Sequence, residues 1–355
     1  MGILWITLFL VFLLAFYSRF LAKPVSNGFI TFQPNRFMML LAMLLMAVVS
    51  GLRNNIGDTF FYMYSYNNFP LEWSDIKFEA DFGFNLMQLL LQKISEDAQL
   101  LIFTVALITN VFIIYVLYKY SNLFELSLYL YFTTGLYLMS MNGIRQFLAA
   151  ALAFAATKFI FEGSWHKYIL VILLAATIHQ SALVLIPIYF IVRRKAWTYQ
   201  TFILLSLAII FVIGFAQFSG ALFTVIKDTK YSEYQNLETN GANFLRVIVT
   251  AVPLVIAFLG RHRLRELFPK ADYIVNLSLI NVVIMLIATQ QWVFARFSFY
   301  FGLYNLLLIP WIVKLFVRKE QRLIYYLIVL FYFVYCYYEN VVSLNIIYKS
   351  DFLKF

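Results

Sequence analysis

The chain has 355 residues, of which 63% are hydrophobic and only 12% are charged, and its mean hydropathy is +0.82. A soluble domain of this size carries roughly twice that share of charged residues, so the composition excludes an ordinary water-soluble protein. The net charge of +10 is typical of basic cytoplasmic loops in a membrane protein, and we expect no nucleic-acid partner. The single cysteine, Cys336, excludes an internal disulfide and a metal site built from several cysteines.

Long apolar runs recur along the chain, and each is long enough to cross ~30 Å of hydrocarbon. The first run lacks a basic start and a small-residue cleavage site, so we interpret it as a retained span and not as a signal peptide. The runs are continuous and lack the alternation of barrel strands, so we predict an all-α bundle of transmembrane helices. No polar stretch is long enough for a soluble domain, so residues 1–355 are predicted to form one membrane domain. Ten full spans are predicted, at residues 3–21, 36–52, 99–118, 123–139, 145–161, 199–219, 244–260, 273–290, 297–316 and 322–338.

One apolar run, residues 168–192, is interrupted by polar residues around His179. As a single crossing, it would place Lys167 and the basic triplet 193–195 on opposite sides of the membrane. As a hairpin of two half-length helices bent near His179, it returns the chain to the same side. With the hairpin and an outside N-terminus, 17 of the 27 Lys and Arg residues lie inside, against 12 with a single crossing. The positive-inside rule therefore favours a broken or re-entrant helix pair around His179.

This topology predicts two outer loops, at about residues 53–98 and 219–243. In the first loop, residues 82–91 have a helical apolar face, and we expect this segment to lie along the membrane interface. The second loop is either a lid over a cavity or a plain connector.

Polar and charged residues that are costly near a membrane gather at four places, all of them at the outer face in the predicted topology. Each has an ordinary interpretation: an arginine at a helix end can reach lipid headgroups, Asp58 can pair with Arg53, and a buried histidine can simply form hydrogen bonds. The four places contain Arg53, Asp58 and Tyr62; Arg145 and Gln146; His179; and Trp292 and Arg296.

Taken together, the four places favour a site for a phosphate-bearing lipid. Arginine offers a planar fork of donors that matches phosphate oxygens, and histidine exchanges a proton near neutral pH. The histidines, at positions 166, 179 and 262, fall on different sides and lack metal-ligand spacing, so we predict no metal. Phosphate-loop and dinucleotide-binding motifs are absent from the sequence, so we predict no nucleotide cofactor.

In this order, the four places resemble the EpsG family of bacterial exopolysaccharide proteins, which is related to the Wzy-type O-antigen polymerases. The resemblance extends over about residues 35–315. The matching pieces are Gly51-Leu52-Arg53 with Ile56-Gly57-Asp58 and Tyr62; Asn142 with Ile144-Arg145-Gln146 and Leu148-Ala149-Ala150-Ala151; His179 with Ser181-Ala182-Leu183; and Arg296 with Phe299-Tyr300-Phe301.

The resemblance implies an integral-membrane glycosyltransferase of the bacterial cytoplasmic membrane. Such a protein joins undecaprenyl-pyrophosphate-linked oligosaccharide repeat units at the outer leaflet, without a cofactor. Its implied partners are this lipid-linked substrate, membrane lipids, and a chain-length regulator and a flippase of the same pathway.

Roles for the candidate residues follow from this implied reaction. Fixed arginine donors would stabilise the charge that builds on the leaving pyrophosphate. The attacking sugar hydroxyl needs a base, for which His179 is the first candidate and Asp58 the second. The residues assigned to substrate binding are Arg53, Arg145, Arg296, Gln146 and Tyr62.

Two other activities stay open. A flippase or other transporter of the same lipid-linked sugars would predict charges along a path through the bilayer and inverted repeats, whereas the charges here lie at one face and no repeat is visible. An O-antigen ligase-like transferase would use the same outer-face arginines and histidine, so the sequence barely separates it from a polymerase.

Overall fold

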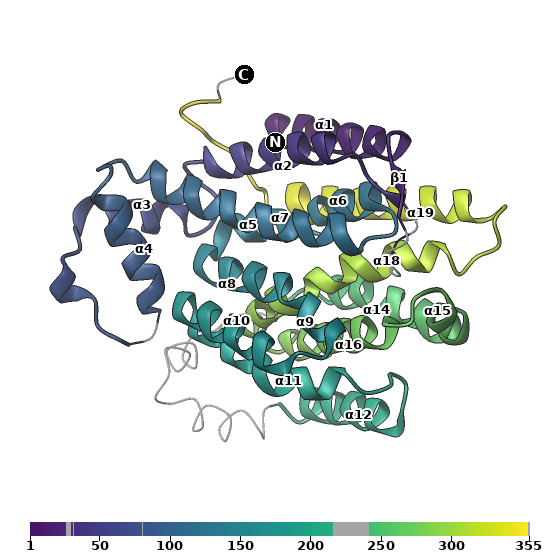
Figure 1. The fold of residues 1–355 in the computed structure, drawn as a ribbon. Helices are drawn as coiled ribbons and strands as arrows, with labels where there is room; N and C mark the ends of the chain where they lie inside the picture. The colour runs from purple at the N-terminus through teal and green to yellow at the C-terminus, as the bar shows by residue number, and fades with distance from the viewer. Residues whose placement is uncertain (26–29, 31, 80, 216–240, 354–355) are drawn as a thin grey trace.

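The apolar runs of the sequence fold as helices, because a helix satisfies its backbone donors and acceptors within its own segment. The computed structural model describes residues 1–25, 30, 32–79, 81–215 and 241–353. In these ranges the helices lie mostly side by side, with α3 and α4 projecting at one end (Figure 1). Six are long and apolar enough to cross a membrane, as expected of a multi-pass membrane protein: Gly2–Phe20, Gln99–Tyr120, Ile144–Glu162, Ala271–Ala288, Trp292–Val313 and Gln321–Ser343.

The first half of the chain contains two long helices, several short ones and one pair of two-residue antiparallel strands. In order, its elements are α1 (Gly2–Phe20), β1 (Lys23–Pro24), β2 (Phe32–Gln33), α2 (Arg36–Gly51), α3 (Thr59–Asn68), η1 (Trp73–Asp75), α4 (Phe82–Gln92), α5 (Gln99–Tyr120), α6 (Phe124–Thr133), α7 (Leu136–Asn142), α8 (Ile144–Ala155) and α9 (Thr157–Glu162).

The second half is also helical, with several short 3₁₀ segments between the helices. In order, its described elements are α10 (Trp165–Ile178), η2 (Gln180–Val184), α11 (Leu185–Val192), α12 (Tyr199–Ile213), α14 (Phe244–Leu259), α15 (Arg261–Leu267), α16 (Ala271–Ala288), η4 (Trp292–Phe297), α17 (Ser298–Phe301), η5 (Gly302–Tyr304), α18 (Asn305–Val313), α19 (Gln321–Tyr337) and the π-helical η6 (Tyr338–Ser343).

The structure does not confirm ten full spans. Helix α2 has only 16 residues, and α12 has 15 before the chain leaves the described residues. The predicted span 123–139 is divided at Gly135, whose left-handed backbone (φ +85°) ends α6 and begins α7. The predicted span 244–260 forms α14, which is followed by an 84° bend into α15. Helices α2 and α14 thus match their predicted ranges to within one residue but are short for a full crossing, whereas the run 123–139 is broken inside its predicted range.

The predicted break at His179 is confirmed, and the chain doubles back there. His179 has an extended backbone between α10 and η2 (φ −153°, ψ 114°). The rings of Tyr168 and Tyr189 lie 4.9 Å apart, and Arg193 Nη1 donates to the carbonyl of Ile160 at 3.2 Å. The end of α11 therefore lies beside the start of α10, as a hairpin requires (Figure 1).

The predicted helix at residues 82–91 is also confirmed, as α4, and Figure 1 shows it outside the main bundle beside α3. Most of the predicted loop 219–243 falls on residues 219–240, which lie outside the described residues.

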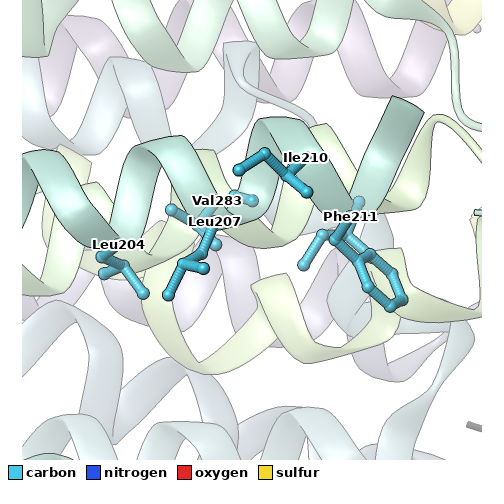
Figure 2. Close-up of a pocket in the computed structure, with 7 residues that line it drawn as sticks. Leu204, Leu207, Ile210, Phe211 and Val283 are labelled. Atoms are coloured by element: carbon cyan, nitrogen blue, oxygen red, sulfur yellow. The ribbon is translucent and has the colours of Figure 1, made fainter. Parts of the chain in front are cut away.

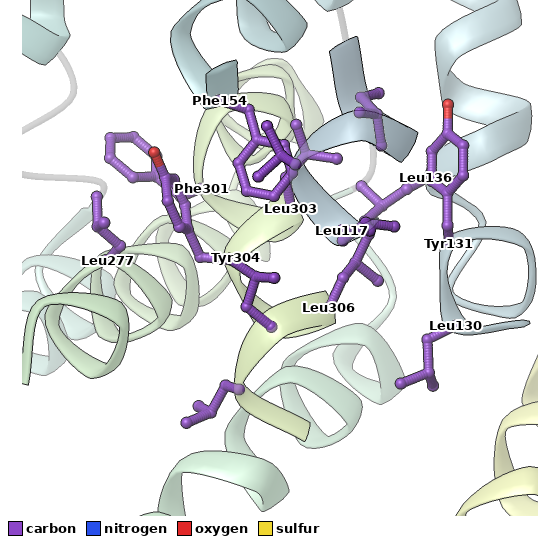
Figure 3. Close-up of a cluster of buried hydrophobic side chains, with 14 of the residues drawn as sticks. Leu117, Leu130, Tyr131, Leu136, Phe154, Leu277, Phe301, Leu303, Tyr304 and Leu306 are labelled. Carbon is purple, nitrogen blue, oxygen red and sulfur yellow. The ribbon is translucent and has the colours of Figure 1, made fainter. Parts of the chain in front are cut away.

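The core is formed where α6 passes through the middle of the bundle, since all ten of its residues are buried. Figure 3 shows Tyr131 near Leu136 and Leu117, and Phe154 near Phe301. These side chains belong to one hydrophobic cluster, which fixes the relative positions of the helices that carry the site.

Arg53 connects three elements at the end of the bundle where α3 and α4 lie. Its side chain is 1% exposed, its Nε donates to Thr59 Oγ1 at 3.0 Å, and its Nη2 donates to the carbonyl of Met141 at 2.7 Å. Its Nη1 donates to the carbonyl of Ser50. The guanidinium thus connects the end of α2 with the start of α3 and with the last turn of α7.

The C-terminal tail covers the same turn from outside. The backbone amide of Asn54 donates to the carbonyl of Lys349 at 3.1 Å, and Ser350 Oγ donates to the carbonyl of Leu52 at 2.5 Å. Residues far apart in sequence therefore hold the turn after α2 in place.

We predict that Arg53→Met lowers the thermal stability of the detergent-solubilised protein by at least about 2 kcal/mol, because buried carbonyl groups lose their charged donor. Arg36→Met is the matched control, since Arg36 is exposed at the other end of α2. Thermal unfolding followed by tryptophan fluorescence measures both. Equal midpoints for the two variants would contradict a structural role for Arg53.

Candidate functional site

The four candidate places lie close together at one end of the bundle. The first and second meet where Arg145 Nε donates to Tyr62 OH at 3.3 Å. The second and fourth meet where Gln146 Nε2 donates to the backbone carbonyl of Arg296 at 3.2 Å. The second also reaches the third place, because the same Gln146 nitrogen lies 3.3 Å from Ser181 Oγ. The folded chain therefore joins segments that the sequence separates by more than 200 residues.

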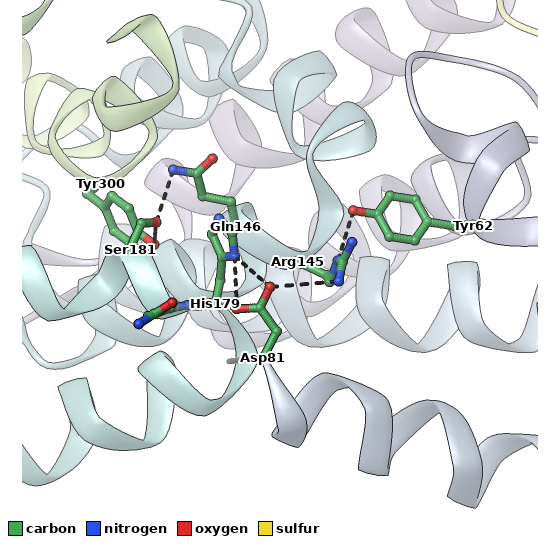
Figure 4. Close-up of polar contacts among 8 residues, drawn as sticks. Tyr62, Asp81, Arg145, Gln146, His179, Ser181 and Tyr300 are labelled. Carbon is green, nitrogen blue, oxygen red and sulfur yellow. Dashed lines mark hydrogen bonds and ion pairs between the residues drawn. The ribbon is translucent and has the colours of Figure 1, made fainter. Parts of the chain in front are cut away.

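The centre of this region is Asp81, a buried carboxylate at the start of α4. His179 Nδ1 lies 3.3 Å from each of its oxygens, and the backbone amide of Gln180 donates to Oδ1 at 2.8 Å. Arg145 Nη1 lies 3.7 Å from Oδ2, at ion-pair distance. Figure 4 shows the carboxylate between the imidazole and the guanidinium. One side chain thus fixes both a titratable base and a cation.

Asp81 was not among the residues predicted from sequence. It is one of several acids in the 53–98 loop, and only its place directly before the amphipathic segment 82–91 sets it apart. Its partners His179 and Gln180 lie about a hundred positions away in the chain, at a contact that local patterns do not encode.

Gly83 allows α4 to approach α10 closely enough for this contact. A β-carbon at position 83 would lie 2.3 Å from Thr177 Oγ1 and 2.8 Å from Thr177 Cβ. Both distances are shorter than real contacts of a β-carbon, so a larger residue would push α4 away from α10. Asp81 lies two residues before this contact and His179 two residues after it, so the close approach brings the two side chains together.

Arg145 lies at the edge of a cavity of about 370 Å³ whose lining also includes Asp58, Tyr62 and Phe84. Its guanidinium carbon lies 5.4 Å from the ring centres of both Tyr62 and Phe84, within cation–π range. These rings and Asp81 hold the cation in position. The Arg145 side chain is still 38% exposed, so part of it faces the cavity. A fixed, partly exposed guanidinium is suited to binding an anion in this cavity.

A second polar chain lies beside the first. Ser181 Oγ lies 2.8 Å from Tyr300 OH, and Gln146 contacts the same Ser181 (Figure 4). This chain joins α8, η2 and α17, and it holds the hairpin tip against the bundle next to His179. Neither Ser181 nor Tyr300 was assigned a role from sequence, although both lie in the pieces that carry the family resemblance.

The structure therefore brings most of the sequence-predicted residues together. Tyr62, Arg145, Gln146 and His179 are joined through contacts with one another or with Asp81 and Ser181, and Asp58 lines the Arg145 cavity. The surroundings of Arg53 and Arg296 differ from those of Arg145.

Arg53 is buried, with donors directed to two backbone carbonyls and to Thr59, so the structure shows it positioning the turn below the cavity. Arg296 lies with its guanidinium carbon 5.3 Å from the ring centre of Trp292, and within the described ranges it is not among the residues that line the Arg145 cavity. Within those ranges, moreover, no three His, Cys, Asp or Glu side chains are grouped as metal ligands.

A third feature is an apolar groove of about 390 Å³ between α12 and α16 (Figure 2). Its walls include Leu204, Leu207, Phe211 and Val283, and every described residue of the lining is apolar. This composition is typical of a surface in contact with lipid chains, and it offers no group for catalysis.

The sequence model of the EpsG family matches residues 36–352. The match includes the four candidate places and extends past the predicted limit of about residue 315, so that it also includes α19 and most of the C-terminal tail. No curated protein and no solved structure matches the chain. Because the family match spans most of its length, the chain belongs to the EpsG family, a family of Wzy-like polymerases.

Proposed function

We propose that this protein is a polysaccharide polymerase, a glycosyltransferase that joins undecaprenyl-pyrophosphate-linked oligosaccharide repeat units at the outer leaflet of the bacterial cytoplasmic membrane. The observation that carries this proposal is the Asp81 carboxylate in contact with both His179 and Arg145, next to a cavity. Membership of a family of Wzy-like polymerases supports the reaction class.

The reaction replaces one bond to an anomeric carbon with another. The hydroxyl oxygen of the acceptor sugar forms a bond to the anomeric carbon of the growing glycan, and the bond from that carbon to the carrier pyrophosphate breaks. The pyrophosphate leaves with the bonding electron pair, so negative charge builds on its oxygen in the transition state. Arg145 is our first candidate for stabilising this charge, because its position is fixed before the reaction by Asp81 and two aromatic rings.

The proton of the attacking hydroxyl needs an acceptor, and His179 is our first candidate. A carboxylate can only accept a hydrogen bond, so the contact with Asp81 requires the proton on Nδ1 and leaves Nε2 as the basic nitrogen. Asp81 then orients the ring and stabilises the imidazolium that forms, as the acid does in other base–carboxylate pairs. Asp58, which lines the cavity beside Arg145, remains the second candidate base or an orienting group for the acceptor sugar.

The distribution of basic residues supports an outer location for the site. The ends of α1, α11 and α18 that carry Arg19, Arg193 and Lys314 lie at the end of the bundle away from α3 and α4 (Figure 1). By the positive-inside rule this basic end faces the cytosol, so the site faces outward. We keep Arg296 as a second phosphate-binding candidate from the neighbouring η4, and a flippase and a chain-length regulator as expected partners.

Arg145→Ala should lower the rate of polymerisation by about 10²–10³-fold, the usual effect of removing one fixed donor at a developing oxyanion. Arg145→Lys should recover only part of the rate, because an ammonium lacks the planar fork. The assay is purified protein in nanodiscs with lipid-linked repeat units, read as polymer ladders on gels. Arg318→Ala, an exposed arginine at the opposite end, is the control. A normal ladder from Arg145→Ala would show that this residue does not bind the leaving group.

The same assay separates the alternative activities. Ladders indicate a polymerase, and transfer of glycan to a different acceptor indicates a ligase. Movement of the lipid-linked unit across the membrane without new bonds indicates a flippase.

His179→Ala and Asp81→Asn should each lower the turnover by about 10²–10⁴-fold, the contribution typical of a general base and its orienting partner. His179→Ala should still bind undecaprenyl pyrophosphate, because Arg145 and its ion pair with Asp81 are retained, whereas Asp81→Asn removes that ion pair and should also weaken binding. Single-turnover rates and equilibrium binding measure the two quantities separately. Full turnover in His179→Ala would move the base role to Asp58 or to another group.

A further inference from the structure

A second cavity, of about 470 Å³, opens at the same end of the bundle and lies against the turn after α2. Its polar lining consists mainly of amide side chains, with one carboxylate. These residues come from three separate parts of the chain, and they are Asn55, Asn142, Glu339, Asn340 and Asn345. Neither the family resemblance noted from sequence nor the proposed polymerase chemistry assigns a role to this cavity.

Only one oxygen of the Glu339 carboxylate accepts hydrogen bonds from the described residues. Glu339 is 2% exposed, and its Oε1 accepts from Arg246 Nε at 2.7 Å and also from Arg246 Nη2. Oε2 is buried and has no hydrogen-bond partner among the described residues. A buried carboxylate oxygen without a donor is costly, so a ligand hydroxyl that donates to it would be bound with a substantial gain in free energy.

The chemistry of the lining suits a neutral sugar better than a phosphate. Arg246 balances the charge of Glu339, and the other polar groups of the lining are asparagine amides. The Asn55 amide already bonds to the backbone of residues 347 and 349, so the groups left for sugar hydroxyls are Asn142 Nδ2, Asn340 Oδ1 and the Asn345 amide. Leu138 and Met139 add apolar surface for the C–H faces of sugar rings. The cavity beside Arg145, in contrast, presents a partly exposed cation that favours an anion.

The two cavities share a thin wall formed by residues 55–58. Asn142 Oδ1 accepts from the backbone amide of Asp58 at 3.0 Å, while Asn142 lines the second cavity and Asp58 lines the first. The wall is kept thin at Gly57, where a β-carbon would lie 2.1 Å from Asn142 Oδ1 and where φ is +55°. A glycan in the second cavity would therefore lie next to a pyrophosphate in the first.

We propose that the second cavity is a binding subsite for the oligosaccharide part of the substrate, with a sugar hydroxyl donating to Glu339 Oε2. This proposal rests on the proposed function, since it names where the glycan lies relative to the pyrophosphate. The structure thus divides recognition of one lipid-linked substrate between an arginine cavity and an amide-lined cavity.

Protection of an introduced cysteine tests the location of the glycan in protein that is already folded. Asn345→Cys places a thiol in the cavity lining at an exposed position, and Ser343→Cys places one at an exposed position two residues away that is not among the lining residues. The native Cys336 is buried and should not react. The probe is lipid-free repeat oligosaccharide, released by mild acid from the lipid-linked units of the host.

At about ten times its dissociation constant, this oligosaccharide should slow maleimide labelling of Asn345→Cys about tenfold and leave labelling of Ser343→Cys unchanged. Equal rates with and without oligosaccharide at both positions, although the oligosaccharide binds, would overturn the proposed location.

Glu339→Gln tests the proposed contact itself. It should weaken binding of the oligosaccharide on the order of tenfold or more, because the charged acceptor is lost. Binding of sugar-free undecaprenyl pyrophosphate should be unchanged, which also shows that the variant is folded. Arg145→Ala should give the reverse pattern. Oligosaccharide binding at wild-type strength in Glu339→Gln would overturn the subsite and leave the polymerase proposal standing. Wild-type protein could also bind both the oligosaccharide and undecaprenyl pyrophosphate but make no polymer from lipid-linked units. That result would overturn the polymerase proposal and leave the subsite standing.

Discussion

One buried carboxylate holds the candidate site together. Asp81 contacts the imidazole of His179, the amide of Gln180 and the guanidinium of Arg145, and these groups come from the hairpin tip and from the start of α8. A carboxylate in this environment is costly unless it is paired and hydrogen-bonded, so its partners are held in place by the same energy that keeps it buried. The consequence is that the imidazole and the guanidinium, our proposed base and phosphate-binding group, are held in fixed positions by one side chain.

Other polar contacts near Asp81 hold the backbone of the turn after α2 in place. Arg53 fixes the turn after α2, the C-terminal tail covers that turn, and Gly57 lets it pass close to Asn142. The turn then separates two cavities of different character, one next to a cation and one lined with amides. A lipid-linked glycan has the same two parts, an anionic pyrophosphate and a polyhydroxyl chain.

Patterns within single segments were enough to predict the helical class and the helix at 82–91. The hairpin at His179, and with it the common location of the four polar places, followed from the distribution of Lys and Arg over the whole chain. Local patterns did not reveal Asp81, because its contacts depend on the packing of α4 against α10 at Gly83. That packing brings it to His179 and Gln180, about a hundred residues away in the chain. Local patterns also overestimated the spans, because an apolar run such as 123–139 does not show that Gly135 ends the helix inside it.

The proposed function requires that the Arg145 cavity opens toward the outside of the cell. Phe61 lies on the cavity wall and is 70% exposed, and Tyr199, 72% exposed, begins α12 at the opposite end of the bundle. Phe61→Cys and Tyr199→Cys, each in intact cells treated with a membrane-impermeant maleimide, test the claim most directly. Labelling of Phe61→Cys in intact cells, with Tyr199→Cys labelled only after permeabilisation, is the predicted result. The reverse pattern would place the site in the cytosol and contradict the account.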